Sequence, residues 1–425
     1  MALALAGIAQ RYDLSIAIID AAKAEDSTPT AAGDLDGRAT ALALGSRNLL
    51  DSIGVWADLA SQAQPIMDID VSDQGKPFGA KMHAQEMDQE ALGYVLQNQH
   101  MGQVFWQQLT QHCDAQVAII DQAQVLQVDN ARQDSKLVYE RTLEGQAEPE
   151  KVEITCQLVI MADGGRSSLR ESLGMFNHQQ SYDQVAVVVN VALDKDHQGL
   201  ACERFTAKGP MAVLPLLPDV TSANSNAHNQ HRAAIVWTQP QERETELAAM
   251  DDATLLAELQ NQIGFRMGEF RALGERQVYP LSLSVAKEQA RQGLAVIGNA
   301  AHTLHPIAGQ GFNLALRGAF ALAEQVHMAC KDQAPLGDLA YLQQFVDASS
   351  GDQKRTVGAS DQIMKLFSSR DKSLTLGRQL GLLAIQNMPL AKTVFTRSAM
   401  GLDRPLANVL AVPKAAPQTT EGGAS

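Results

Sequence analysis

The chain has 425 residues, 45% hydrophobic and 19% charged, a composition typical of a globular protein with material for two domains or one large composite domain. Its 34 basic and 48 acidic residues give a formal net charge of −14, which argues against nucleic acid as a main partner because phosphate binding needs clustered positive charge. The four cysteines show no C-x-x-C spacing, so no metal site is predicted and a reducing compartment fits best. No apolar run reaches transmembrane length and no signal-peptide pattern begins the chain. We therefore expect a cytoplasmic protein, either free or attached peripherally to the inner membrane.

The first residues predict a helix packed on a sheet, followed by a β-branched strand from Leu14 to Ile19 that ends at Asp20. This is the second half of a dinucleotide-binding unit, in which the closing acid binds the ribose hydroxyls. The first strand and the G-x-G-x-x-G turn of such a unit are absent, so we expect the chain to begin inside its first helix. Without that phosphate contact we expect marginal stability and weak cofactor binding. Asp20 is the candidate ribose ligand, and a solvated turn is the alternative.

A glycine turn, D-G-R-A, precedes an apolar helical pattern and places Arg38 where a guanidinium can face a phosphate, although a plain surface charge is the alternative. Farther along, a helix beginning near Gly102 carries Gln103. A buried strand, Gln157 to Met161, then runs into D-G-G-R-S-S. There Gly164 permits close approach of a ligand to the backbone, Asp163 suits a ribose or helix-start amides, and Arg166 suits a pyrophosphate.

The stretch from residue 293 to residue 324 predicts a buried strand, a glycine-rich turn and the start of a long helix. Free N–H groups and the positive end of the helix dipole meet at such a start, which suits an anionic cofactor. We expect the backbone at Gly309 and Gly311 to approach that cofactor or to take conformations that other residues avoid. The candidate ligands here are Gly298, Asn299, Pro306, Gly309, Gln310, Gly311, Phe312 and Asn313.

These stretches resemble the fingerprints of the FAD-dependent aromatic hydroxylases, the p-hydroxybenzoate hydroxylase-like family. The third fingerprint of that family reads G-D-A-A-H, a proline, then G-x-G-x-N, and this chain departs from it only at Asn299. Asn in place of Asp is associated with the branch that hydroxylates 2-polyprenyl-6-methoxyphenols in ubiquinone biosynthesis. The resemblance implies that Asn299 contacts the ribityl chain, that Arg38 and Gln103 lie near the flavin, and that the second fingerprint touches both FAD and NADH or NADPH.

The implied fold is α/β: a doubly wound, Rossmann-like FAD-binding domain lacking its first strand, an inserted antiparallel-sheet substrate domain and a C-terminal helical region. We assign residues 1–65, 92–172 and 281–350 to the FAD-binding domain and residues 66–91 and 173–280 to the substrate domain. Residues 351–411 are expected to be helical and residues 412–425 to be a disordered tail.

The implied activity is hydroxylation of a polyprenyl phenol para to its oxygen, with O₂ activated as a C4a-hydroperoxide of FAD that NADH or NADPH has reduced. A ubiquinone-biosynthesis complex is a further implied partner. No catalytic acid or base is assigned; His302 and His305 lie near the ring by motif position, and a packing role is the alternative for both. Another flavin enzyme of the superfamily, or a flavin-free scaffold subunit, would also fit the sequence, and a flavin absorbance spectrum separates the scaffold from the enzymes.

The C-terminal region differs in charge from the rest of the chain. Residues 365–414 hold eight basic and two acidic residues, a net charge of +6, interleaved with apolar residues. Basic amphipathic helices bind anionic lipid, and a polyprenyl substrate is drawn from a bilayer. Membrane contact is therefore one interpretation, and docking on the acidic main domain is the other.

Overall fold

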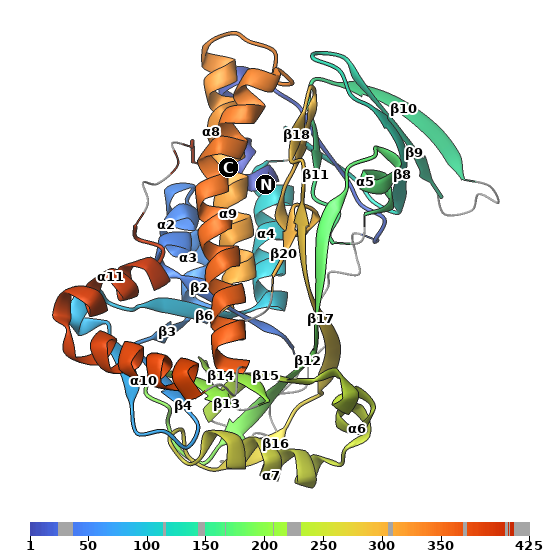
Figure 1. The fold of residues 1–425 in the computed structure, drawn as a ribbon. Helices are drawn as coiled ribbons and strands as arrows, with labels where there is room; N and C mark the ends of the chain where they lie inside the picture. Colours follow the sequence, from blue (N-terminus) through green and yellow to red (C-terminus); the bar gives the residue numbers. More distant parts are fainter. Residues whose placement is uncertain are drawn as a thin grey trace, which may run out of the picture.

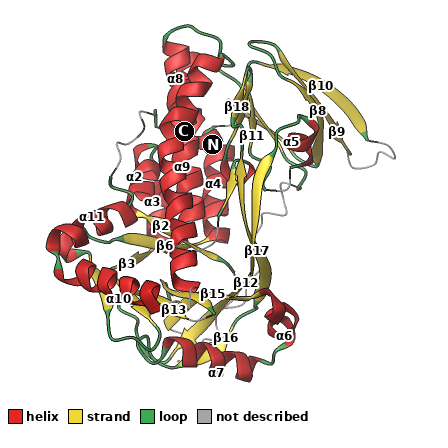
Figure 2. Ribbon diagram, in the orientation of Figure 1, coloured by secondary structure: helices red, strands yellow, loops and turns green. Residues whose placement is uncertain are grey.

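The protein is described by a computed structural model that covers residues 1–23, 37–113, 116–142, 149–165, 167–206, 208–218, 231–304, 309–368, 372–403, 407 and 409–411. Side chains of residues 112, 359–361 and 363–376 are outside this description. Figure 1 shows an upper body built around long helices and a lower body built on a large sheet, and Figure 2 shows the same division by secondary structure.

The upper body contains the following elements: α1 (Ala2–Tyr12), β1 (Ile16–Ile19), β2 (Ala39–Ala43), α2 (Leu44–Ser52), α3 (Trp56–Leu59), β3 (Gln64–Ile66), β6 (Gly93–Gln97), α4 (Asn98–His112), β7 (Val117–Ile120), β8 (Ala123–Asp129), β9 (Ser135–Arg141), β10 (Glu150–Cys156), β11 (Val159–Met161), α5 (Ser168–Ser172), β18 (Ala290–Arg291), β19 (Leu294–Val296) and α8 (Gln310–Lys331). The lower sheet and the connections to it contain β4 (Asp68–Asp73), β5 (Gly79–His83), β12 (Asn177–Leu193), β13 (Leu200–Thr206), β14 (Gly209–Leu216), β15 (His231–Pro240), α6 (Glu244–Ala249), α7 (Asp252–Ile263), β16 (Phe270–Leu273), β17 (Gln277–Ala286) and β20 (His302–Thr303). The C-terminal helices are α9 (Leu339–Ser368), α10 (Lys372–Asn387) and α11 (Pro389–Ala399).

The parallel part of the upper body consists of two strand pairs. β1 pairs with β7, and β11 pairs with β19, each in parallel register. Among the described strands the two pairs belong to separate sheets, β1-β7 and β11-β19-β18. Side chains from both, such as Ile18 and Ile160, nevertheless pack against the same hydrophobic cluster. The interrupted parallel sheet, the second antiparallel sheet and the helical C-terminal region confirm the predicted fold class.

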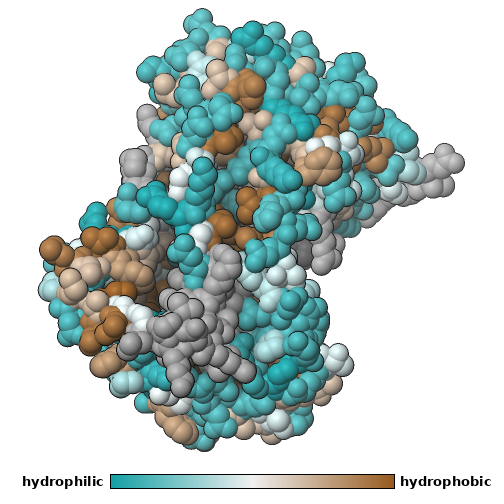
Figure 3. Space-filling view, in the orientation of Figure 1, coloured by the Kyte–Doolittle hydropathy of each residue, from teal (hydrophilic) through white to brown (hydrophobic). Residues whose placement is uncertain are grey.

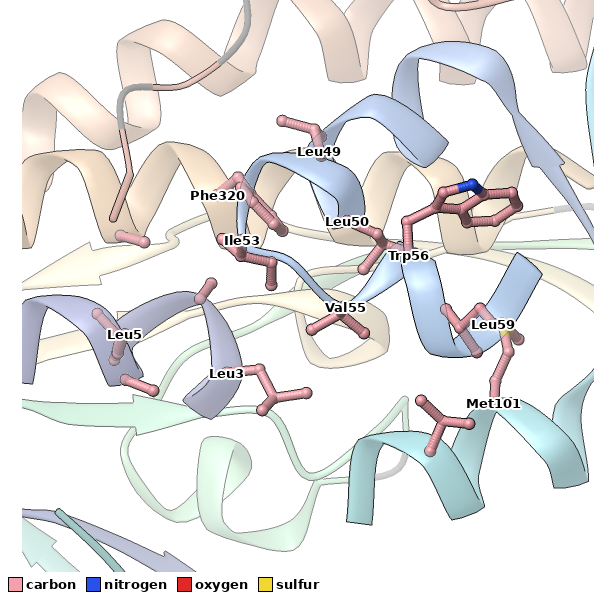
Figure 4. Packing of buried hydrophobic residues seen from close by; sticks show 14 of the residues in the cluster. Leu3, Leu5, Leu49, Leu50, Ile53, Val55, Trp56, Leu59, Met101 and Phe320 are labelled. Carbon is pink, nitrogen blue, oxygen red and sulfur yellow. The ribbon is translucent and has the colours of Figure 1, made fainter. Parts of the chain in front are cut away.

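The upper core forms where α1, α2, α3 and α8 meet. Leu3 and Leu5 of α1 face Ile53 and Val55, and Phe320 of α8 closes the cluster (Figure 4). All five side chains are buried. Burial of one such side chain contributes roughly 1.5–3 kcal/mol, so this cluster holds the helices over the strands that carry the predicted site.

The lower sheet has the strand order β20-β17-β12-β15-β14-β13-β4-β5, with β16 also pairing with β12. Residues 68–83 thus join strands that lie more than a hundred positions later in the chain. β12 alternates in its second half, where Val185, Val187 and Val189 enter a core covered by α7. β17 runs without a break from Gln277 to Ala286 and so crosses position 280, which we predicted as a domain boundary.

The C-terminal helices lie along the outside of both bodies, with α9 packed on α8 and α10 on β5 (Figure 1). Arg378 of α10 is buried and donates from Nε and Nη2 to Oδ2 of Asp73, at 3.0 and 2.8 Å. Lys392 of α11 bonds to Glu86 at 2.9 Å. Two of the basic residues in the positive C-terminal region therefore dock the helices onto acidic groups of the main body. Among the described helices, none is long and apolar enough to cross a bilayer.

Replacing Arg378 tests this docking contact. We expect Arg378→Met to lower the free energy of unfolding by about 3–5 kcal/mol, because it removes the charged partner of the buried Asp73 carboxylate and leaves the bond from Gln379 at 3.2 Å. The measurement is denaturant unfolding of the variant, of Asp73→Asn and of the double variant. A double variant closer to wild type than Arg378→Met confirms the pairing, whereas simply additive losses contradict it.

Candidate functional site

The predicted third fingerprint forms a turn between β19 and the start of α8. Gly298 has φ 62° and Gly309, the N-cap of α8, has φ 61°, both in the left-handed region that favours glycine. A Cβ at Gly309 would lie 3.1 Å from Cβ of Ala41, so the turn also packs closely against β2. Of the two glycines expected to approach the cofactor or to take a disfavoured conformation, Gly309 has the positive φ, whereas Gly311 has an ordinary helical conformation.

Asn313 holds this turn to β2. Its Oδ1 accepts from the backbone N–H of Ala43 at 2.8 Å, and its Nδ2 donates to the carbonyls of Ala41 and Gly309 at 2.8 and 2.9 Å. The side chain is 1% exposed. Its amide is thus engaged with backbone, and its action on a bound cofactor is to position the turn. The neighbouring Gln310 and Phe312 are partly buried at the first turn of α8, and Pro306 and His305 lie outside the described residues.

The predicted second fingerprint leads from β11 into the short helix α5. Asp163 accepts from the hydroxyl of Ser167 at 2.6 Å, and Oγ of Ser167 accepts from the N–H of Arg170 at 2.9 Å. Through Ser167, Asp163 is therefore linked to the start of α5. Gly164 has φ 90°, and Arg166 lies outside the described residues.

Arg170, which sequence reasoning did not assign, joins the second turn to the third. Its side chain is 2% exposed and donates from Nη1 to the carbonyl of Ala300 at 2.6 Å. A Cβ on Gly165 would lie 2.8 Å from Oγ1 of Thr303, so the two turns are in contact. The only sequence signal for Arg170 is its place in the first turn of an amphipathic helix, and that signal does not distinguish it from a surface arginine.

The three candidate cofactor ligands from the N-terminal half of the chain differ in exposure. Arg38 is exposed directly before β2, and its carbonyl accepts from the N–H of Asn98. Gln103 is partly buried on α4. Asp20 is exposed at the end of β1, where Oδ1 accepts from the N–H of Ala22 at 2.9 Å in a local turn. The structure thus brings Gly165 next to Asn299, and Gly309 next to Ala41, whereas the described side-chain hydrogen bond of Asp20 stays within its own turn.

The geometry of these turns fits a flat, anionic cofactor. A Cβ added at Gly164, Gly298 or Gly311 would meet no atom within 4 Å, so the space beside the backbone is open at each of these glycines. Gly311 lies in the first turn of the 22-residue helix α8, where unpaired N–H groups and the positive dipole end favour negative charge. Asn299 is exposed at the same turn. In the described part of the chain no cluster of His, Cys, Asp or Glu could hold a metal ion.

His302 lies behind the third turn, not on its open side. It is 3% exposed, and both ring nitrogens lack a hydrogen-bond partner in the structure. Burial, reinforced by the Arg317 charge, lowers the pKa of His302 to about 4. The imidazole is therefore neutral at pH 7, which agrees with a packing role more than with that of a proton carrier.

The chain matches the family described as FAD binding domain over residues 3–342. It is 32% identical over 388 residues to ubiquinone hydroxylase UbiL of Rhodospirillum rubrum, covering 91% of this chain and 84% of that protein. It is 28% identical over 402 residues to 3-demethoxyubiquinol 3-hydroxylase of Escherichia coli, covering 94% and 95%. Among solved structures, p-nitrophenol 4-monooxygenase PnpA of Pseudomonas putida has the same fold, with a TM-score of 0.70 at 16% identity over 95% of this chain and 96% of that one.

The fold, the open glycine turns and these matches define the class: the chain belongs to the FAD-binding domain family and is an FAD-dependent monooxygenase. Within that class it belongs to the branch of the ubiquinone hydroxylases. The resemblance of its fingerprints to the aromatic hydroxylases is thereby confirmed.

Gly311 provides a direct test of where the cofactor lies. Its backbone is unstrained and its Cβ position is open, so Gly311→Val should fold normally and lose FAD affinity at least tenfold, because the side chain would occupy cofactor space. FAD binding is measured by flavin fluorescence titration and folding by circular dichroism. Gly351→Val, at another open helical glycine on α9, is the matched control and should bind FAD as the wild type does. Wild-type affinity in Gly311→Val would contradict the assignment.

Proposed function

We propose that this monooxygenase hydroxylates a 2-polyprenyl-6-methoxyphenol at the carbon para to the phenol oxygen, a step of ubiquinone biosynthesis. The observation that carries this proposal is the agreement between the open glycine turns and the 32% identity to a ubiquinone hydroxylase over 91% of the chain. FAD, reduced by NADH or NADPH, supplies the chemistry that activates O₂. Asp20 and Asp163 are proposed for ribose contacts, Arg38 and Arg166 for the pyrophosphate, and Asn299 for the ribityl chain.

A second candidate is hydroxylation at another carbon of the same ring. It is favoured by the 28% identity to a 3-demethoxyubiquinol 3-hydroxylase, which covers 95% of that protein. Both candidate reactions require the same functions from the protein. Its turns bind the cofactor, the apolar sheet below them excludes water, and the contacts of the ring with that sheet select the carbon that reacts.

The activity test supplies a short-chain probe, 2-prenyl-6-methoxyphenol, to FAD-loaded protein with NADPH or NADH under ¹⁸O₂. We expect one labelled oxygen in the product at the para carbon, located by mass spectrometry and NMR, with nicotinamide oxidation accelerated by the phenol. Label at another ring carbon supports the second candidate. Flavin-loaded protein that oxidises nicotinamide at one rate with and without phenol, and gives no labelled product, would show that neither ring hydroxylation occurs.

We further propose that α10 and α11 contact the membrane that holds the polyprenyl substrate. Large apolar side chains lie exposed there: Leu380, Met388, Leu390, Val394 and Phe395. Leu390 is 84% and Val394 69% exposed, and Figure 3 shows a hydrophobic region on this side of the molecule. Arg397 lies exposed beside them. An apolar surface next to positive charge suits a bilayer containing anionic lipid. A partner in a ubiquinone-biosynthesis complex is the other proposed occupant of this surface.

Charge introduced on α11 tests the membrane contact. We expect the double variant Leu390→Glu, Val394→Glu to lose at least tenfold of its partitioning to vesicles of phosphatidylethanolamine and phosphatidylglycerol, because each apolar side chain contributes about 1.5–3 kcal/mol when buried. Flotation measures the bound fraction. Leu126→Glu, Phe265→Glu, which charges two exposed apolar residues elsewhere, should bind as the wild type does. Equal loss in both double variants, or none in either, contradicts a contact through α11.

A further inference from the structure

One face of the lower sheet is turned toward the cofactor-binding body. Residues of β12, β13, β14 and β15 alternate between a core covered by α7 and this second face. On the second face Asn190 donates from Nδ2 to the carbonyl of Gly37 at 2.7 Å, next to Arg38. Ala201, Leu214 and Ala234 on the same face pack with Leu44 and Val95 of the upper body. These contacts fix the second face of the lower sheet against the segment that leads into β2.

A single register row crosses the middle of this face. Val188 pairs with Val236, Val236 with Ala212, Ala212 with Glu203, and Glu203 with Val71. Adjacent strands lie about 4.8 Å apart, and the row is one side-chain step, roughly 7 Å, from the row of Asn190. Glu203 is the only ionisable residue among these five.

The side chains of this row are partly accessible to solvent although the row lies at the centre of a sheet. Val71, Val188, Val236 and Glu203 are each partly exposed, whereas their chain neighbours Val187, Val189, Ile235 and Trp237 on the opposite face are buried. Side chains on the inner face of a sheet between two packed bodies would be covered if those bodies closed fully. The described side chains of this row therefore leave part of the inner face accessible, with one carboxyl on it.

Glu203 has no polar partner in the part of the chain that the structure describes. Its Oε1 is shielded from solvent and makes no hydrogen bond. Asp70, Arg204 and Arg266 belong to the opposite face, where they interact with one another. On the face of Glu203, Asp73 lies two positions along β4 from Val71 and is bonded to Arg378. Within the described part of the chain, Oε1 of this partly exposed residue is thus left without a hydrogen bond, and a hydroxyl group bound on this face would supply one.

We propose that Glu203 is the catalytic base that accepts the hydroxyl proton of the bound phenol; this assignment rests on the proposed function. The O–H bond of the phenol breaks, its proton passes to a carboxylate oxygen of Glu203, and its electron pair remains on the phenolate oxygen. No oxidant or reductant enters this step. The phenolate directs electron density to the para carbon, which is the position proposed for hydroxylation.

The surroundings of the carboxyl set its proton affinity. Burial raises the pKa of Glu203 to about 7, so near neutral pH the group both loses and accepts a proton readily. The adjacent Cys202 faces the other side and has a pKa of about 12, so it stays uncharged. The end of α9 also approaches β13 and β14, and its ionisable residues Asp361 and Lys365 have side chains outside the described part. Ala212 and Val71, the strand neighbours of Glu203, do not titrate.

Glu203→Gln tests the assignment, with Glu203→Asp as the conservative variant and Glu153→Gln, an exposed strand glutamate on β10, as the control. In wild type and in the control, kcat with 2-prenyl-6-methoxyphenol should rise as the pH passes about 7, because the carboxylate must be unprotonated to act. Glu203→Gln should retain FAD and lose about 10²–10⁴-fold in kcat at pH 7, and its rate should recover toward the pKa of the free phenol. Glu203→Asp should recover part of the loss.

A second readout does not depend on turnover. The ¹⁹F chemical shift of a bound 4-fluoro-2-methoxyphenol carrying a short prenyl chain reports whether the phenol is ionised. Above pH 7 the bound probe should donate its O–H to the Glu203 carboxylate, which moves the ¹⁹F shift toward that of the phenolate, and this displacement should be smaller in Glu203→Gln. An unchanged pH profile and an equal ¹⁹F displacement in the Gln variant would overturn the role of Glu203 while leaving the proposed function intact. A flavin-loaded wild type that hydroxylates no phenol would instead overturn the proposed function.

Discussion

The amide of Asn313 is the contact on which the arrangement of this site depends. Its three hydrogen bonds join Gly309, at the left-handed start of α8, to the backbone of Ala41 and Ala43 in β2. A fully buried amide that satisfies backbone groups on both sides tolerates little displacement, because each lost bond leaves an unpaired polar group out of water. The glycine turn at Gly309 is therefore held at a fixed distance from β2, the strand that follows Arg38. Arg170 acts similarly between Ala300 and the second turn.

Prediction from sequence succeeded where the signal was local. Short apolar runs bounded by glycine marked β11 and β19, and helical spacing after Gly311 marked α8. The Asp163 to Ser167 contact also spans only four positions. The function of Asn313 depended on a strand 270 positions away, and no periodicity encodes that pairing. For Gly309 and Gly311 the sequence left two reasons for glycine open, close approach of a cofactor or a disfavoured dihedral, because it does not show which glycine takes the positive φ; Gly309 does and Gly311 does not.

The face of the lower sheet was beyond sequence reasoning for a different reason. Alternation predicted strands around residues 185–217, but which side of each strand meets the cofactor body depends on the register across four strands. In sequence Glu203 stands next to Arg204 and reads as half of an ordinary ion pair. The structure places the two side chains on opposite faces, and among the described side chains Oε1 of Glu203 then has no hydrogen-bond partner. The surroundings of Glu203 are therefore set by strand pairing across the sheet and not by its neighbours in the sequence.

The long strand β12 has a mechanical consequence. It pairs with β17 from Asn177 to Val188, and β17 in turn pairs with β20 beside the third glycine turn. This strand pairing, whose register shifts between Ser181 and Gln184, thus connects the two bodies. Separating the two bodies would break several of these interstrand hydrogen bonds at once, so a wide opening between the bodies is energetically unfavourable. For the polyprenyl substrate proposed above, we therefore expect entry along the edge of the sheet and not by separation of the two bodies.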